Sequence, residues 1–216
     1  IYYPPEYTRM GEGILSRNLD FEIIPKSIRE NSKLRNPFDF IYVLEIYPDE
    51  GYPSLFISCF ELFGLALDGI NSKGLTVAHL HHDSLNQFGY QPHFEQSVGI
   101  NEILAVQMLL DNCKNCEEAK KLLMMNKHHS IMVPVHLIIG DSNGNSFIWE
   151  YNPINRKEYI LDSSNKPRII TNFPLFHYQL ETDFPQTNQS NCPYERFLKI
   201  KKQIDETEIF DLIKIK

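Results

Sequence analysis

The hydrophobic residues of this chain follow two different periods, and the order of these periods limits the folds that are available to it. Segments rich in Ile, Val, Tyr and Phe alternate with turn residues before residue 82 and again after residue 132, which predicts β-strands. Between residues 102 and 125 the apolar side chains instead recur at helical spacing, as at Ile103, Val106 and Leu110. Strands followed by two helices, more strands and a final helix predict an α+β fold of antiparallel sheets with helices packed outside.

The expected strands cover residues 13–20, 40–47, 55–60, 75–81, 133–140, 146–152, 159–161 and 168–171, and the expected helices cover residues 102–110, 117–125 and 193–204. Three turn clusters divide the strands into β-hairpins. The strongest is 141–145, because Asn143-Gly144 tolerates positive φ at both central positions of a tight turn. Residues 48–53 are rich in Pro and Gly, and residues 68–74 contain two glycines that supply a permissive backbone.

The length and composition fit one folded domain over residues 1–216. Of the 216 residues, 42% are hydrophobic, which is enough to bury a good core. The formal net charge is −7 and no basic run stands out, which argues against a nucleic-acid partner. The longest apolar stretches, such as 131–140, are far too short to span a bilayer, and residues 1–6 have no signal-peptide pattern. The compartment stays open, with the cytoplasm favoured.

The chain has four cysteines, Cys59, Cys113, Cys116 and Cys192. A chain of this length with so few cysteines does not read as a disulfide scaffold. Cys113 and Cys116 form a CxxC pair, but no second CxxC or histidine pair lies at zinc-like spacing, and the flanking residues have a helical pattern. We therefore expect a packing role for this pair, with a metal or redox site as the alternative.

Four short motifs occur in a fixed order along the chain. They are GEGILSRNLDF at residues 11–21, DGINSKGLTVA at 68–78, IGDSNGN at 139–145 followed by Trp149-Glu150, and ITNFP at 170–174. A fifth and weaker match, Arg196-Phe197, opens the last helix. Together they resemble the choloylglycine hydrolase, acid ceramidase and penicillin acyltransferase group of N-terminal-nucleophile (Ntn) amidases. The resemblance implies a four-layer αββα sandwich, in which two antiparallel sheets lie between helical layers.

The resemblance assigns catalytic roles to four side chains. In this family an N-terminal cysteine attacks an amide carbonyl, its own α-amine takes up the thiol proton, and an acyl-enzyme forms. Arg17 would favour the thiolate as a fixed positive charge, and Asp20 would orient the α-amine. Asn172 would help to hold the oxyanion, and Arg196 would belong to the same cluster. Taken singly, Arg17 and Asp20 also fit a surface ion pair, Asn172 a turn, and Arg196 a solvated helix face.

Three histidines, His79, His81 and His82, end the strand of the second motif. In choloylglycine hydrolases the position of His81 holds an asparagine that lines the oxyanion site, so the resemblance makes His81 a substrate-binding candidate. A histidine can still donate a hydrogen bond there. The cluster also suggests a metal site, but His79 and His81 share one strand face while His82 points the other way, and only Asp83 is close in sequence. We therefore expect no metal and no cofactor.

The family's nucleophile is not found at its expected place. Counting back from Arg17 with the family spacing leads to position 1, which is isoleucine. The Pro-rich segment 3–6 resembles a longer first hairpin seen in some relatives, which predicts a Cys-Ser or Cys-Thr dipeptide just before Ile1. We also expect further strands of the family fold beyond residue 216. The alternative is a catalytically inactive relative.

Two functions follow from these observations. The first is hydrolysis, or acyl transfer, at a linear amide C–N bond of a small-molecule substrate. The second is a non-catalytic protein on the same scaffold that binds an acyl ligand. Several aromatic residues are candidates for an apolar acyl pocket or for the core: Phe60, Phe63, Tyr90, Phe94 and Phe173. The sequence does not select one amide substrate, and it leaves homo-oligomer formation open.

Overall fold

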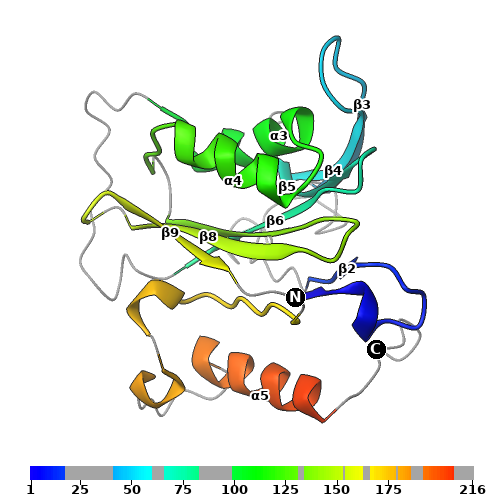
Figure 1. Cartoon of the computed structure of the whole chain (residues 1–216). Helices are drawn as coiled ribbons and strands as arrows, with labels where there is room; N and C mark the ends of the chain where they lie inside the picture. The colour runs from blue at the N-terminus through cyan, green and yellow to red at the C-terminus, as the bar shows by residue number, and fades with distance from the viewer. Residues whose placement is uncertain are drawn as a thin grey trace, which may run out of the picture.

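The computed structural model shows an α+β fold built from two antiparallel sheets (Figure 1). It describes residues 1–17, 41–59, 66–82, 99–130, 134–152, 154–162, 166–178, 180–185 and 192–206. The larger sheet has seven strands in the order β3-β4-β5-β6-β7-β8-β9, and the smaller sheet pairs β1 with β2. The larger sheet is therefore a meander, in which strands that follow each other in the sequence are also neighbours in space.

The smaller sheet consists of β1 (Tyr2–Tyr3) and β2 (Ile14–Leu15). The larger sheet consists of β3 (Ile41–Ile46), β4 (Ser54–Cys59), β5 (Ala66–Asn71), β6 (Thr76–His81), β7 (Val135–Gly140), β8 (Ser146–Asn152) and β9 (Lys157–Asp162). The α-helices are α3 (Glu102–Asn112), α4 (Cys116–Met125) and α5 (Pro193–Asp205). Short 3-10 helices are η1 (Pro5–Tyr7), η2 (Leu175–His177) and η3 (Glu181–Asp183).

The three predicted hairpins are present, as β3–β4, β5–β6 and β7–β8. In the β5–β6 hairpin the Asn71 side chain closes the turn, because its Oδ1 accepts from the amides of Lys73 at 3.0 Å and Leu75 at 3.1 Å. Its Nδ2 donates to the carbonyls of Leu110 at 2.8 Å and Cys113 at 2.7 Å. One asparagine thus attaches the end of α3 to the larger sheet.

Helices α3 and α4 cover one face of the larger sheet (Figure 1). Val106 and Leu109 of α3 and Leu123 of α4 are fully buried in one core cluster with Val77 and Leu137 of the sheet. Burial of this kind contributes about 25 cal/mol for each Å² of apolar surface removed from water. Packing of the two helices on the sheet therefore stabilises this half of the molecule.

The opposite face of the larger sheet is covered by β1 and β2, and α5 lies beyond them (Figure 1). Tyr2 packs in a second cluster with Ala78 and Ile138 of the larger sheet. Its neighbour Tyr3 faces the other way and packs with Ile204 of α5, because successive side chains of a strand alternate between its faces. The layers therefore follow the order helices, sheet, sheet, helix, which confirms the αββα fold class.

Some predicted elements differ in the structure. Residues 168–171 do not form the expected strand, since only Arg168 bridges to Tyr2. The strand Tyr2–Tyr3 was not predicted, because it is too short to show a period. Cys113 and Cys116 are free thiols that are each 1% exposed, which agrees with packing, and burial raises the pKa of Cys113 to about 12. None of the helices in the ranges given above is long and apolar enough to cross a membrane.

Candidate active site

Arg17 is held by the larger sheet, although it follows β2 of the smaller one. Its Nη1 donates to Asp68 Oδ1 at 2.6 Å and to the carbonyl oxygen of His79 at 2.7 Å. The two side chains are 17% and 13% exposed, so this ion pair is largely shielded from solvent. Burial raises the pKa of Asp68, and the Arg17 guanidinium opposes that rise by favouring the carboxylate.

The contacts of Arg17 lie where β5 and β6 separate. The ladder between these strands reaches Asp68 opposite Ala78. Beyond it, the amide of His79 donates to Asp68 Oδ1 at 3.3 Å, and the carbonyl of His81 accepts from Asn172 Nδ2 at 2.8 Å. Because alternate carbonyls of a strand point to the same edge, Arg17 and Asn172 lie along one edge of β6.

Asn172, His81 and Arg196 form a second cluster. Besides its bond to the His81 carbonyl, Asn172 Nδ2 lies 3.4 Å from His81 Nδ1. Arg196 Nη2 donates to Asn172 Oδ1 at 2.7 Å. The asparagine amide is therefore fixed at its oxygen by the first turn of α5 and at its nitrogen by the end of β6.

Aromatic side chains hold the loop of Asn172 against α5. The Phe173 ring is completely buried, with its centroid 4.6 Å from that of Tyr194 and 5.6 Å from that of Phe197. Thr171 Oγ1 also donates to the carbonyl of Pro193 at 2.9 Å. Phe173 is therefore part of the core and not of an acyl pocket. The other aromatic candidates, Phe60, Phe63, Tyr90 and Phe94, lie outside the described residues.

Glu150 anchors the same loop from the side of the larger sheet. It is fully buried on β8, and its Oε1 lies 2.8 Å from Nδ1 of the fully buried His136. Its two oxygens also accept from the amides of Leu175 at 2.9 Å and Phe176 at 2.8 Å. The sequence motif indicates Glu150 only as the end of a hairpin. Its position as the one carboxylate within the apolar run 147–151 was a signal for a buried role.

The other two histidines at the end of β6, His79 and His82, are buried. His82 is completely buried and its ring lies 5.4 Å from that of His136. Burial lowers the pKa of His79 to about 3 and that of His82 to about 2. Across the described ranges, no three His, Cys, Asp or Glu side chains are grouped as metal ligands.

The structure brings most of the predicted site residues together. Arg17, Asn172, Arg196 and His81 lie in two clusters that share the edge of β6. Asp20 lies outside the described residues. Asp68 was not predicted as a site residue, although it opens the motif at residues 68–78, because its contact with Arg17 joins residues 51 positions apart.

The fold is an αββα sandwich whose two polar clusters share the edge of β6. The family model of linear amide C–N hydrolases, choloylglycine hydrolase family, matches residues 8–197. The chain therefore belongs to the choloylglycine hydrolase family of linear amide C–N hydrolases. No curated protein sequence matches it.

Solved structures agree with this fold. Penicillin V acylase from Agrobacterium tumefaciens is 20% identical, with a TM-score of 0.53 over 81% of this chain and 59% of that chain. A mutant conjugated bile acid hydrolase from Clostridium perfringens is 19% identical, with a TM-score of 0.58 over 82% of this chain and 69% of that chain. A second variant of that hydrolase is 17% identical, with a TM-score of 0.52 over 81% and 68%. These identities show the fold alone, and the chain spans 59% of the length of the acylase.

Proposed function

We propose that this protein hydrolyses a linear amide C–N bond of a small molecule with a cysteine that stands just before Ile1. The observation that carries the proposal is the register of the smaller sheet. Ile1 and Ser16 exchange two backbone hydrogen bonds, of 2.7 and 2.8 Å. Tyr2 pairs with Leu15 next to them. Continued past Ile1, this register would bring the residues of the expected Cys-Ser or Cys-Thr dipeptide alongside Arg17.

Arg17 would act on this cysteine as a fixed positive charge. A neighbouring guanidinium lowers the pKa of a thiol and so raises the fraction present as thiolate, which is the nucleophile. Asp68 and the His79 carbonyl hold the guanidinium in place, at 2.6 and 2.7 Å. Asp20 would orient the α-amine, as the family resemblance implies.

Asn172 would stabilise the oxyanion through its side-chain amide. Arg196 fixes the amide oxygen, which also fixes the direction of the two Nδ2 hydrogens. One of these hydrogens binds the His81 carbonyl, and the other would donate to the developing negative charge. A donor of this kind contributes about 3 kcal/mol of barrier lowering. His81 would contact the substrate from the end of β6.

The reaction would proceed in two steps. The α-amine of the cysteine takes the thiol proton, and the sulfur bonds to the amide carbonyl carbon. The C–N bond then breaks, and the proton leaves with the amine. Water next attacks the thioester, which releases the carboxylic acid and restores the thiol. If another nucleophile takes the place of water, the same site performs acyl transfer.

The test uses the full-length protein purified in its mature form. Intact mass and N-terminal sequencing identify the residue before Ile1, and amine release is measured with penicillin V, a glycine-conjugated bile acid and a straight-chain N-acyl amide. We expect an N-terminal cysteine, turnover of at least one amide, and a covalent acyl adduct. The control replaces that cysteine with alanine, which removes both turnover and adduct. A mature terminus without Cys, Ser or Thr would exclude this mechanism and leave the acyl-binding alternative.

A further inference from the structure

The first strand is hydrogen-bonded along both of its edges. On one edge Ile1 exchanges two backbone hydrogen bonds with Ser16, beside the pairing of Tyr2 with Leu15 of β2. On the other edge the amide of Tyr2 donates to the carbonyl of Arg168 at 2.9 Å, and the amide of Arg168 donates to the carbonyl of Tyr2 at 2.8 Å. A two-residue strand has little stability of its own. The position of β1 therefore depends on what holds these neighbours.

The Tyr2 side chain occupies a slot that two glycines leave open. Its ring is 1% exposed and its hydroxyl donates to the carbonyl of Asp141 at 2.9 Å. A Cβ added at Gly140 would lie 2.2 Å from a ring carbon, and one added at Gly13 would lie 2.6 Å from the hydroxyl oxygen. Both distances are well inside van der Waals contact, so the ring fits only because these residues lack side chains.

Both attachments of Tyr2, through Asp141 and through Arg168, lead to the β7–β8 hairpin. Asp141 Oδ1 accepts from the amides of Asn143 and Asn145 within the turn, at 3.0 and 3.1 Å. Its Oδ2 accepts from the amide of Cys116 at 3.0 Å, which joins the turn to the start of α4. The hairpin that receives the Tyr2 hydroxyl is thus itself fixed by one carboxylate.

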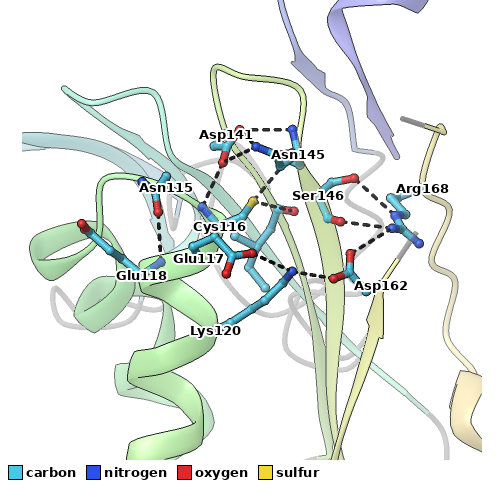
Figure 2. Close-up of polar contacts among 11 residues, drawn as sticks. Asn115, Cys116, Glu117, Glu118, Lys120, Asp141, Asn145, Ser146, Asp162 and Arg168 are labelled. Atoms are coloured by element: carbon cyan, nitrogen blue, oxygen red, sulfur yellow. Dashed lines mark hydrogen bonds and ion pairs between the residues drawn. The ribbon is translucent and has the colours of Figure 1, made fainter. Parts of the chain in front are cut away.

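Arg168 is attached to the same hairpin just after its turn (Figure 2). Its guanidinium donates to Ser146 Oγ at 3.3 Å and to the Ser146 carbonyl at 3.1 Å, and it lies 3.9 Å from Asp162 Oδ1. Asp162 also pairs with Lys120 of α4 at 2.5 Å. The Arg168 side chain is buried, and its bonds to Ser146 hold the segment beside β1 against the hairpin.

We infer that Tyr2 and Arg168 are positioning residues of the active site, because together they fix β1, and with it the cysteine before Ile1, against the β7–β8 hairpin. This inference rests on the proposed function. Arg17 is fixed separately, by Asp68 and the His79 carbonyl. A shift of β1 would therefore change the distance between the thiol and the guanidinium, since the larger sheet holds the guanidinium in place.

The test compares Tyr2→Phe with Tyr3→Phe in the full-length protein. Both variants lose one hydroxyl from a buried tyrosine of β1, but Tyr3 faces α5 and not the hairpin. The readout is the pH profile of iodoacetamide alkylation at the N-terminal cysteine, followed by peptide mass spectrometry. For Tyr2→Phe we expect the midpoint to rise by about one pH unit and the rate at neutral pH to fall about tenfold, because the thiolate is less favoured. For Tyr3→Phe we expect both values to stay within about twofold of wild type.

A second pair of variants tests the slot itself. Gly140→Ala should raise the midpoint as Tyr2→Phe does, and it should have little further effect in a Tyr2→Leu background, since the clash is then removed. If Tyr2 had only a structural role, these variants would lower the melting temperature without moving the midpoint of the alkylation pH profile. A reactive cysteine whose midpoint ignores Tyr2→Phe would overturn this inference alone. A mature protein without that cysteine would overturn the proposed function as well.

Discussion

The polar side chains Arg17, Asn172 and Glu150 at the candidate site each have specific partners. Arg17 binds a carboxylate and a backbone carbonyl, and Asn172 lies between Arg196 and β6. Glu150 accepts two backbone amides and lies against His136. Buried charges without such partners cost several kcal/mol, so the pairs define the geometry of the site and not only its stability.

Replacing Asp68 with asparagine should uncouple Arg17 from the larger sheet. The amide keeps the shape and one acceptor but removes the charge, so the guanidinium loses its ionic partner. We expect amide hydrolysis to fall by about tenfold or more, and the free energy of unfolding to fall by about 2 kcal/mol. The matched control is Asp49→Asn in the exposed β3–β4 turn, which should change neither quantity measurably. A wild-type value of kcat/KM in Asp68→Asn would show that the Asp68 carboxylate is not needed to hold Arg17 in place.

At the scale of elements, the sequence predicts those helices and hairpins that local residues determine. Turn residues and hydrophobic period are local properties, and the three hairpins and helices α3, α4 and α5 follow from them. Strand β1 does not follow from them, because its partners Leu15 and Arg168 are distant in the sequence. The Tyr2 ring also needs a glycine at position 140. The motifs located Arg17, Asn172 and Arg196 singly, but not the edge of β6 that joins them.

Glu150→Gln should loosen the η2 segment that follows Asn172. A glutamine has one acceptor oxygen, whereas Glu150 uses both oxygens for the amides of Leu175 and Phe176. We expect the free energy of unfolding to fall by about 3 kcal/mol and kcat to fall with it, because Asn172 is displaced. Urea denaturation and amine release measure the two effects. The surface variant Glu117→Gln is the control, with an expected change within about 0.5 kcal/mol, and an equal loss in both variants would contradict the anchoring role.

At the scale of the whole molecule, the layers place polar groups in positions that water does not reach. The larger sheet is covered by α3 and α4 on one face and by β1, β2 and α5 on the other (Figure 1). The end of β6 runs between these layers, and the imidazoles of His79 and His82 are buried there. Folding therefore lowers the pKa of both imidazoles below the value that they have in the unfolded chain.

The stability of the protein should consequently decline in mild acid. The pKa of His79 is lowered from 6.5 to about 3, and that of His82 from 6.5 to about 2, both chiefly by burial. Above pH 6.5 neither the folded nor the unfolded state binds these protons, so the two imidazoles do not reduce the free energy of unfolding. As the pH falls below 6.5 the unfolded chain binds them first, and each ring costs close to 1.4 kcal/mol per pH unit.

Substituting His82 by phenylalanine isolates one of these two contributions. The ring lies edge-on to His136 and Phe176, so an apolar ring of similar shape can replace it. Urea denaturation at pH 7, 6 and 5 should then show a loss of stability between pH 6 and 5 that is smaller than in wild type by about 1.4 kcal/mol. The exposed His177 provides the control, because His177→Phe should remove a smaller part of the slope. An unchanged slope in His82→Phe would mean that this imidazole is protonated in the folded protein, and that the end of β6 is open to water.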